Sequence, residues 1–168
     1  MAYTIYDASV PVMIRALTNI SKILDKAAAQ AKAEDKPLAA LIDGKLAEDM
    51  RTLPFQIQSA SDAAKFTAAR LGGIEAPAMA DTETTFPELS ARLAKTIDFL
   101  KSVKPEQLAG GEDREVVLKF PQGEMKFTGR DYLANFALPN FFFHVTTAYA
   151  ILRHKGIGIG KMDFLGGV

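Results

Sequence analysis

The sequence contains no cysteine and no tryptophan, and two histidines among its 168 residues. Without cysteine the chain can form no disulfide, no thiolate nucleophile and no thiolate metal ligand. A net charge is also missing, because 20 lysines and arginines balance 20 aspartates and glutamates. Balanced charge supplies no field that would draw the chain to nucleic acid or to an anionic membrane surface. We therefore expect neither nucleic acid nor a membrane among its partners.

Long hydrophobic runs are missing as well. No apolar stretch approaches the roughly 18 residues from which a membrane-spanning helix is inferred. The opening segment, MAYTIYDASVPVMIRAL, has neither a basic start nor a small-residue cleavage site of the kind that marks a secreted protein. These features predict a cytoplasmic protein.

What the chain does have is a hydrophobic content of 48%, enough for one buried core, and we expect a single domain over residues 1–168. Apolar residues recur at gaps of three and four in four long segments, which is the pattern of helices that bury one face. Those segments span about 4–33, 46–73, 86–103 and 128–156. Each apolar face must be covered by the others, so the pattern predicts an all-α four-helix bundle, antiparallel or with a crossover connection.

Local signals refine this prediction. Pro11 lies in the first helical segment and either bends it or leaves the residues before it as a separate turn. Thr85 with Glu88, and Thr128 with Asp131, are typical starts of the third and fourth helices. Between these two helices, EVVLKF and EMKFT flank a PQG turn, which predicts a small β-hairpin. In the glycine-rich tail we expect apolar anchors at Phe164 and Leu165.

The fourth helix, which includes LANFALPNFFFHVTTAYAILRH, is apolar on nearly every side, so we expect it to be central or to build an oligomer interface. At 100° per residue, Asn140, His144 and Thr147 fall on one apolar face that we expect to point inward. Buried polar groups need partners. The other histidine, His154, lies about 80° around the helix from His144, so the two are unsuited to bind one ion.

The second helical segment offers two partners for this group. Asp49 and Gln56 lie at the edge of its apolar face, and Pro54 lies inside the segment. Pro54 and Pro139 would each leave a backbone carbonyl of the preceding turn unpaired. These features predict a polar pocket between the second and fourth helices. The simpler interpretation, a buried histidine satisfied by an aspartate in the core, stays open.

Several stretches resemble a bacterial family of unknown function in the DinB/YfiT-like superfamily. The similarity covers almost the whole chain, and it is carried by LAEDM, AARLGG, TFPELSARLAKTIDFL and above all ALPNFFFHVTTAYAILRHKGIGIGKMDFLG. The resemblance implies a four-helix bundle, a homodimer and the bacterial cytoplasm, with no assigned activity for this branch.

The wider superfamily often binds a divalent metal ion through three histidines, one from helix two and an H-x-x-x-H pair from helix four, and some members are thiol-dependent transferases or isomerases. In this sequence Asn140 stands at the first position of the pair, His144 stands at the second, and Asp49 is nearest to the helix-two position. Asparagine is a weak ligand for zinc or nickel, although Asp, Asn and His together can hold a hard cation or a water.

The sequence supports two alternative functions, a binding domain and an enzyme. The first is a non-catalytic dimeric or small-ligand-binding domain with a degenerate metal site, its ligand contacted by Asp49, Gln56, Asn140, His144 and Thr147. The alternative is a metal-dependent or acid-base enzyme that uses a pocket of Asp49, Asn140 and His144. The incomplete histidine set and the lack of a cysteine nucleophile favour the first.

Overall fold

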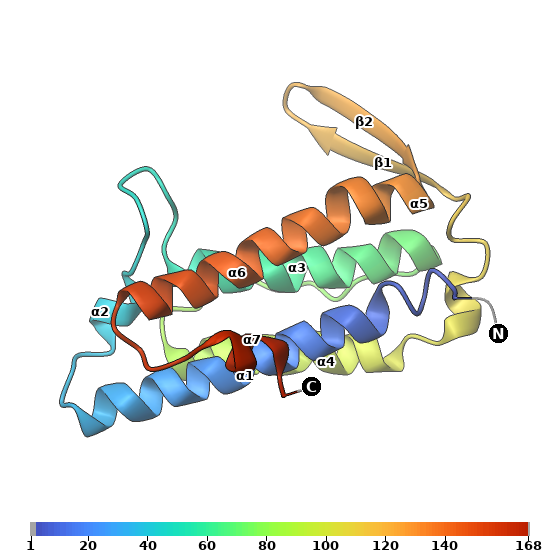
Figure 1. The fold of residues 1–168 in the computed structure, drawn as a ribbon. Coiled ribbons are helices and arrows are strands. Elements are labelled where there is room, and N and C mark those ends of the chain that lie inside the picture. The colour runs from blue at the N-terminus through green and yellow to red at the C-terminus, as the bar shows by residue number, and fades with distance from the viewer. Residues whose placement is uncertain (1–2, 168) are drawn as a thin grey trace.

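The computed structural model describes residues 3–167 and contains four long helices arranged as a bundle (Figure 1). These are α1 (Val10–Ala33), α3 (Leu53–Gly72), α4 (Phe86–Ser102) and α6 (Leu138–His154). Helix α3 packs against α4 and α6, and α1 packs against the other side of the same two helices. Within the described residues, no helix is long and apolar enough to cross a bilayer.

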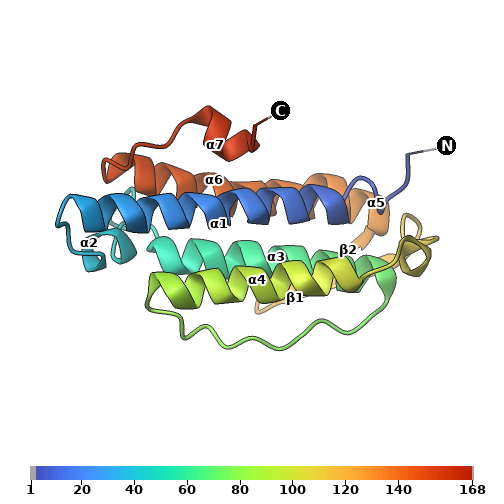
Figure 2. The same ribbon diagram turned by 90° about the horizontal axis from the view of Figure 1, so that it is seen from below.

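The bundle has a crossover between α3 and α4. Contacts between α3 and α4 advance in the same direction along both helices, from Gln58 with Arg92 to Ser61 with Thr96. The two helices are therefore parallel, and residues 74–85 run back along the length of the bundle to join them (Figure 2). Helix α6, in contrast, is antiparallel to α3, because Gln56 contacts His144 and Arg70 contacts Tyr132.

The remaining elements are short. They comprise α2 (Ala39–Ile42), a 3₁₀ turn η1 (Pro105–Leu108), β1 (Glu115–Phe120), β2 (Gly123–Thr128), α5 (Gly129–Tyr132), a π-helical turn η2 (Leu133–Ala137) and α7 (Lys161–Leu165). The predicted hairpin is confirmed: β1 and β2 pair antiparallel, with Val116 opposite Phe127. An isolated hairpin is marginal in water, and here Phe127 packs on the rings of Tyr132 and Phe136.

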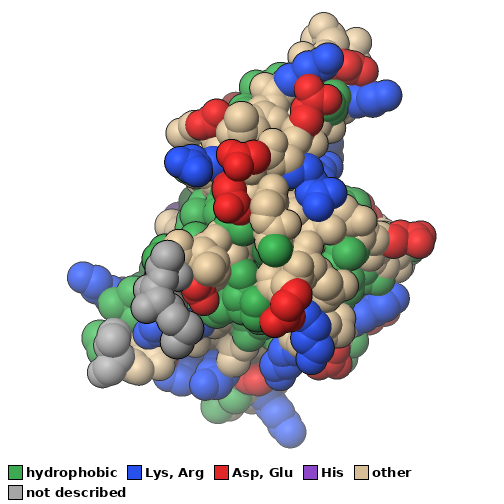
Figure 3. Space-filling model, turned by 90° about the vertical axis from the view of Figure 1, so that its right-hand side faces the viewer, with side chains coloured by type: hydrophobic (Ala, Val, Ile, Leu, Met, Phe, Trp, Pro, Cys, Tyr) green, Lys and Arg blue, Asp and Glu red, His purple; other side chains and the backbone are tan. Residues whose placement is uncertain are grey.

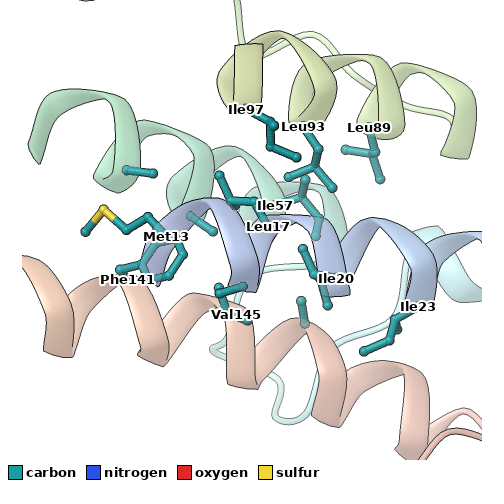
Figure 4. Packing of buried hydrophobic residues seen from close by; sticks show 14 of the residues in the cluster. Met13, Leu17, Ile20, Ile23, Ile57, Leu89, Leu93, Ile97, Phe141 and Val145 are labelled. Carbon is teal, nitrogen blue, oxygen red and sulfur yellow. The ribbon is translucent and has the colours of Figure 1, made fainter. Parts of the chain in front are cut away.

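The core lies between the four long helices (Figure 4). All seven apolar residues that the spacing places on the inner face of α1 are at most 1% exposed: Val10, Met13, Leu17, Ile20, Leu24, Ala27 and Ala31. Helix α1 begins at Val10, so the residues before Pro11 form a separate turn, and Pro11 occupies the first turn of the helix. Proline is tolerated there because its missing N–H has no intrahelical acceptor.

The predicted start of the second helix was wrong. Helix α3 begins at Leu53 and not near residue 46, and Leu46 is 41% exposed. Pro54 is again in the first turn and causes no mid-helix kink. Because proline favours the first turn of a helix, α3 begins beside Pro54 just as α1 begins beside Pro11. Asp49 therefore lies outside the helix, in an exposed connection.

The predicted inner face of the fourth helix was also only partly right. The residues that the core buries are Leu133, Ala137, Phe141, Val145 and Ala148, whereas Asn140 and His144 are half-buried at the edge of that face. Three successive gaps of four residues would drift about 120° around an α-helix. The π turn η2 absorbs this drift, since the Leu138 N–H bonds to the carbonyl of Leu133, five residues earlier.

The tail is more ordered than the sequence indicated. It forms α7, which lies along α1, where Lys26 pairs with Asp163 and Asn19 Nδ2 donates to the carbonyl of Phe164 at 3.0 Å. The Phe164 ring meets Tyr149 of α6 edge-on, with ring centroids 5.7 Å apart.

Candidate functional site

A cavity of about 220 Å³ lies between α3 and the continuous helix formed by α5, η2 and α6, which we call the α3–α6 groove. Helix α3 contributes one stripe of side chains at helical spacing, and the second stripe comes from the facing helix. The lining residues are Ser59, Asp62, Ala63, Phe66 and Arg70 from α3, and Tyr132, Phe136, Ala137, Asn140 and His144 from its partner. Because the two helices are antiparallel, His144 lies at one end of the groove and Arg70 at the other.

Hydrogen bonds fix the tautomer of His144. Its Nδ1 lies 2.8 Å from Oε1 of Gln56, and the amide Nε2 of Gln56 donates to the carbonyl of Arg51 at 3.2 Å. The carbonyl of Arg51 holds the Gln56 amide so that its oxygen faces the imidazole, and an amide oxygen can only accept. Nδ1 therefore carries the proton, and Nε2 carries a lone pair. The rings of Phe55 and Phe143 both meet the imidazole edge-on.

Burial lowers the pKa of His144 below its usual value of 6.5, because desolvation penalises the charged imidazolium. The ring is therefore neutral at pH 7. Nε2 has no protein partner among residues 3–167, and it is not sealed away from solvent. A neutral imidazole with an oriented Nδ1–H and a free Nε2 is suited to accept a proton or a hydrogen bond from a bound molecule.

Three further polar groups of the groove lack protein partners in the part of the chain that the structure describes. They are the hydroxyl of Ser59, the amide of Asn140 and the Oδ2 atom of Asp62. Ser59 and Asp62 lie one turn apart on α3, and Asn140 lies one turn before His144 on α6. The end of the groove near His144 therefore presents donors and acceptors that only water or a ligand can satisfy.

The other oxygen of Asp62 belongs to a buried ionic cluster. Oδ1 of Asp62 accepts from Lys65 Nζ at 2.9 Å and from Arg92 Nη2 at 2.7 Å, and both cationic side chains are at most 3% exposed. Arg92 also pairs with Asp81 and Glu83 of the crossover segment. Burial acts to raise the pKa of Glu83, but hydrogen bonds from its own backbone, Gln58 and Arg92 outweigh burial and hold that pKa below its usual value.

Of the five side chains that the sequence singled out, the structure brings three together. Gln56 and His144 are hydrogen-bonded, and Asn140 lines the same groove as His144. Thr147 is instead buried in the core, where its hydroxyl donates to the carbonyl of Phe143 at 2.7 Å. Asp49 is exposed in the connection before α3 and does not line the groove. The aspartate that reaches this groove is Asp62.

Sequence reasoning missed Ser59, Asp62 and Arg70. A signal was present, because Ser59 and Asp62 follow Gln56 at steps of three along α3, and Arg70 follows two turns after Asp62. The apolar spacing of α3 identifies the residues that point into the bundle core, namely Leu53, Ile57, Ala60 and Ala64. Ser59, Asp62 and Arg70 lie on a different face of the helix, which this spacing does not single out.

The divalent metal ion implied by the superfamily resemblance does not fit these side chains. Of the two histidines, His144 alone lines the groove, and His154 is exposed at the end of α6. Asp62 is already engaged by two cations. Within residues 3–167 no three His, Cys, Asp or Glu side chains are grouped as metal ligands. The set of donors is unlike the three-residue sites that hold zinc or nickel.

A second cavity, of about 760 Å³, lies at the end of the bundle that carries the hairpin, where hydrophobic side chains are visible among charged ones (Figure 3). The turn before α1, the 105–112 segment and the start of the fourth helix line it. Its lining is mostly apolar, with Glu112 and Arg130 as its charged members.

Comparisons with known proteins agree with the fold. Residues 5–165 match a family described as a domain of unknown function, DUF1993. A crystal structure of a DinB family member protein from Shewanella denitrificans is 37% identical, covers 97% of this chain and 92% of its own, and superposes with a TM-score of 0.90. No curated protein matches. A family match over nearly the whole length and this structural likeness place the chain: it belongs to the DUF1993 family and has a DinB-like helical fold.

Proposed function

We propose that this protein binds a small polar molecule in the α3–α6 groove. The observation that carries the proposal is the free Nε2 of His144, whose tautomer is locked by Gln56 within a groove whose other polar side chains also lack protein partners. In a histidine that serves only the packing of the core, the protein supplies hydrogen-bond partners to both ring nitrogens. In His144 the described residues satisfy only Nδ1, and Nε2 is available to a ligand or to the water that a ligand would replace.

The size and lining of the groove support the proposal. A cavity of about 150 Å³ in another protein accepts benzene, so the 220 Å³ of this groove admit a molecule somewhat larger than one ring. Its lining combines three aromatic rings and two alanine methyl groups with five polar side chains that can orient a ligand. Water bound to Ser59, Asn140 and His144 in the free protein would be displaced on binding.

Acid-base catalysis is the second function that a specific observation favours. The lowered pKa of His144 keeps Nε2 unprotonated at pH 7, so it can take a proton from a bound hydroxyl, amine or activated carbon acid. Gln56 orients the ring in the position that a carboxylate holds in many catalytic pairs, and a neutral amide raises the basicity of the imidazole less than a carboxylate does. Binding is therefore the primary proposal, and proton transfer is its extension.

Protein NMR with a panel of small polar fragments tests the proposal. The panel contains hydroxy acids, amino acids, amino alcohols and amides, and the amide signals of α3 and α6 report where each compound binds. We expect hits to shift signals around Ser59, Asn140 and His144, and the shifts to disappear in Asn140→Ala and His144→Ala. His154→Ala, in the exposed histidine at the end of the same helix, is the control and should bind like wild type.

Absence of any fragment-induced shift in the groove would contradict the proposal, as would binding that survives both substitutions. A hit that wild-type protein converts with a pH profile governed by one group, and that His144→Gln binds without converting, would establish the catalytic extension. The expected homodimer stays a prediction that sedimentation equilibrium can check.

A further inference from the structure

We infer that the ligand of the α3–α6 groove is a small carboxylic acid whose carboxylate is held by Arg70, at the end of the groove remote from His144. The inference rests on the proposed binding function and adds the chemical class of the ligand. It comes from the contacts and the charge of Arg70, which are independent of the observations made at the His144 end.

The guanidinium of Arg70 is held in place before any ligand arrives. Its Nη1 donates to the hydroxyl of Tyr132 at 2.9 Å. Its Cζ lies 5.1 Å from the ring centroid of Phe66 and 5.6 Å from that of Tyr132, both within the range of cation–π contacts. All three side chains line the groove. An arginine stacked in this way loses little side-chain entropy when it binds an anion, so its planar fork is preorganised for a carboxylate.

The charge of Arg70 is not balanced by the protein. Arg92 and Lys65, the two buried cations nearby, are paired with Asp62, but no acidic side chain among residues 3–167 lies within ion-pair distance of Arg70. Asp62 lines the same groove two turns away, and its charge is already compensated by those two cations. Arg70 is therefore a half-buried cation without an acidic partner among the described residues, and a bound anion would balance its charge.

The layout of the groove sets the shape of the acid. Ser59 and Asp62 lie eleven and eight residues before Arg70, which separates their backbones from that of Arg70 by about 16 and 12 Å along the helix. Phe66 precedes Arg70 by one turn on α3 and Phe136 precedes Asn140 by one turn on the facing helix, so both rings line the groove between its two ends. The fitting molecule carries a carboxylate at one end, an apolar or aromatic body, and a hydroxyl or amino group that meets Nε2 of His144 at the other.

A monoanion fits better than a phosphate ester. Arg70 is the one lining cation in the described part of the chain, and Asp62 adds a carboxylate to the same groove. A dianionic phosphate would meet one positive charge and a nearby negative one, whereas a carboxylate matches the two parallel N–H groups of the guanidinium.

The test uses 3-(4-hydroxyphenyl)propanoate, its primary amide and 4-hydroxyphenyl phosphate, with affinities measured by NMR titration of the full chain. We expect the acid to bind wild type at least tenfold more tightly than the amide or the phosphate. Arg70→Met should abolish this preference and leave binding of the amide unchanged. Tyr132→Phe keeps the ring but removes the hydroxyl that orients Arg70, so it should reduce the preference for the acid without removing it.

Arg153→Met is the matched control, because Arg153 also donates a side-chain hydrogen bond, to the carbonyl of Ile157 at 3.3 Å, but does not line the groove. It should retain the full preference. Equal binding of acid and amide to wild type would overturn the inference, as would tighter binding of the phosphate. If neither acid nor amide binds while other fragments shift Asn140 and His144, the inference is wrong and the proposed function stands. If no compound binds in the groove, both fall. The comparison of acid with amide on wild type decides the matter even if Arg70→Met does not fold.

Discussion

Helix α3 carries two polar regions that differ in how completely their groups are paired. On the side that faces α4 and the crossover segment, Arg92 binds three carboxylates and the hydroxyl of Ser61 meets that of Thr96 at 2.6 Å. On the side that faces α6, Ser59, Asn140 and Nε2 of His144 have no partner among the described residues. Asp62 belongs to both, with one oxygen on each side.

The difference distinguishes polar groups that stabilise the fold from polar groups that are available to a ligand. The Arg92 cluster is paired at every buried side-chain nitrogen and oxygen but one, the Nε of Arg92, which within the described residues is the single such atom without a partner. Such a network fixes the crossover segment and α4 relative to α3. The α3–α6 groove is open, and its polar groups contribute little to folding. Substitutions in the two regions should therefore have opposite effects on stability and on binding.

The largest effect is expected for Arg92→Met. Loss of the guanidinium leaves Asp62 and Glu83 without their main cation in a buried setting, which should cost about 3–5 kcal/mol of unfolding free energy. Urea unfolding followed by circular dichroism measures it. Asp81→Asn is the control, because Asp81 is 60% exposed and its pair with Arg92 should contribute less than about 1 kcal/mol. Equal losses for both variants would show that the cluster is not a buried structural unit.

Gln56→Leu should have the next largest effect. Gln56 is 2% exposed, and its loss leaves Nδ1 of His144 and the carbonyl of Arg51 without their partner, at a cost of about 1–3 kcal/mol. Imidazole ¹⁵N shifts should show that His144 then populates both neutral tautomers. Gln56→Glu should raise the pKa of His144 by placing a carboxylate beside Nδ1. An unchanged tautomer in Gln56→Leu would refute the orienting role of Gln56.

Two serines on α3 give the sharpest matched pair. Ser61→Ala removes the buried hydrogen bond to Thr96 and should cost about 1 kcal/mol of stability without affecting groove binding. Ser59→Ala should leave stability within about 0.5 kcal/mol of wild type but weaken fragment binding, since its hydroxyl has no protein partner in the described chain. Thermal unfolding and NMR titration of both variants measure the two quantities. A pattern in which Ser59→Ala is the more destabilising of the two would break the comparison between closed and open regions.

The smallest effect concerns pH. The folded-state pKa of His144 lies below its unfolded value of about 6.5, so the unfolded chain binds more protons between the two values. The contribution of His144 to stability is thus complete above pH 6.5 and is lost as the pH falls through the folded-state pKa. The loss should stay below about 1 kcal/mol, because the ring is only half-buried and solvent screens its charge. In His144→Gln this part of the pH dependence should vanish, and an unaltered profile would show that other groups cause it.

Much of the fold could be predicted from the sequence, because apolar spacing and capping residues act locally. The inner face of α1, the capping box of Thr85 and Glu88, and the hairpin around Gly123 all follow from residues close together in the chain. Pro54 was misjudged because a proline inside a periodic segment is compatible with a kink or with a first turn, and apolar periodicity at Leu46 and Met50 favoured the kink.

The site was predicted less completely, because its assembly depends on contacts distant in sequence. Asn140, His144 and Gln56 were found, since polar residues within apolar helices are conspicuous. Asp62 and Arg70 look like ordinary surface charges in the sequence. Their role depends on which way α3 is rotated in the bundle, on Arg92 reaching across from α4, and on the ring of Tyr132 from the other side. Helical spacing alone does not determine any of these.

The π turn η2 also determines where the fourth helix can lose one residue. It holds one residue more than an α-helix would use between Leu133 and Phe141, and Pro139, which cannot donate a backbone hydrogen bond, is the second residue after it. A deletion of one residue here would convert the π turn into an ordinary α turn and leave both flanking core faces in register. The same deletion anywhere later in α6 would rotate the buried side chains beyond it by about 100°. The surplus residue is thus a spacer that gives Phe136 its place on the groove, and its removal would keep the bundle while reshaping the site.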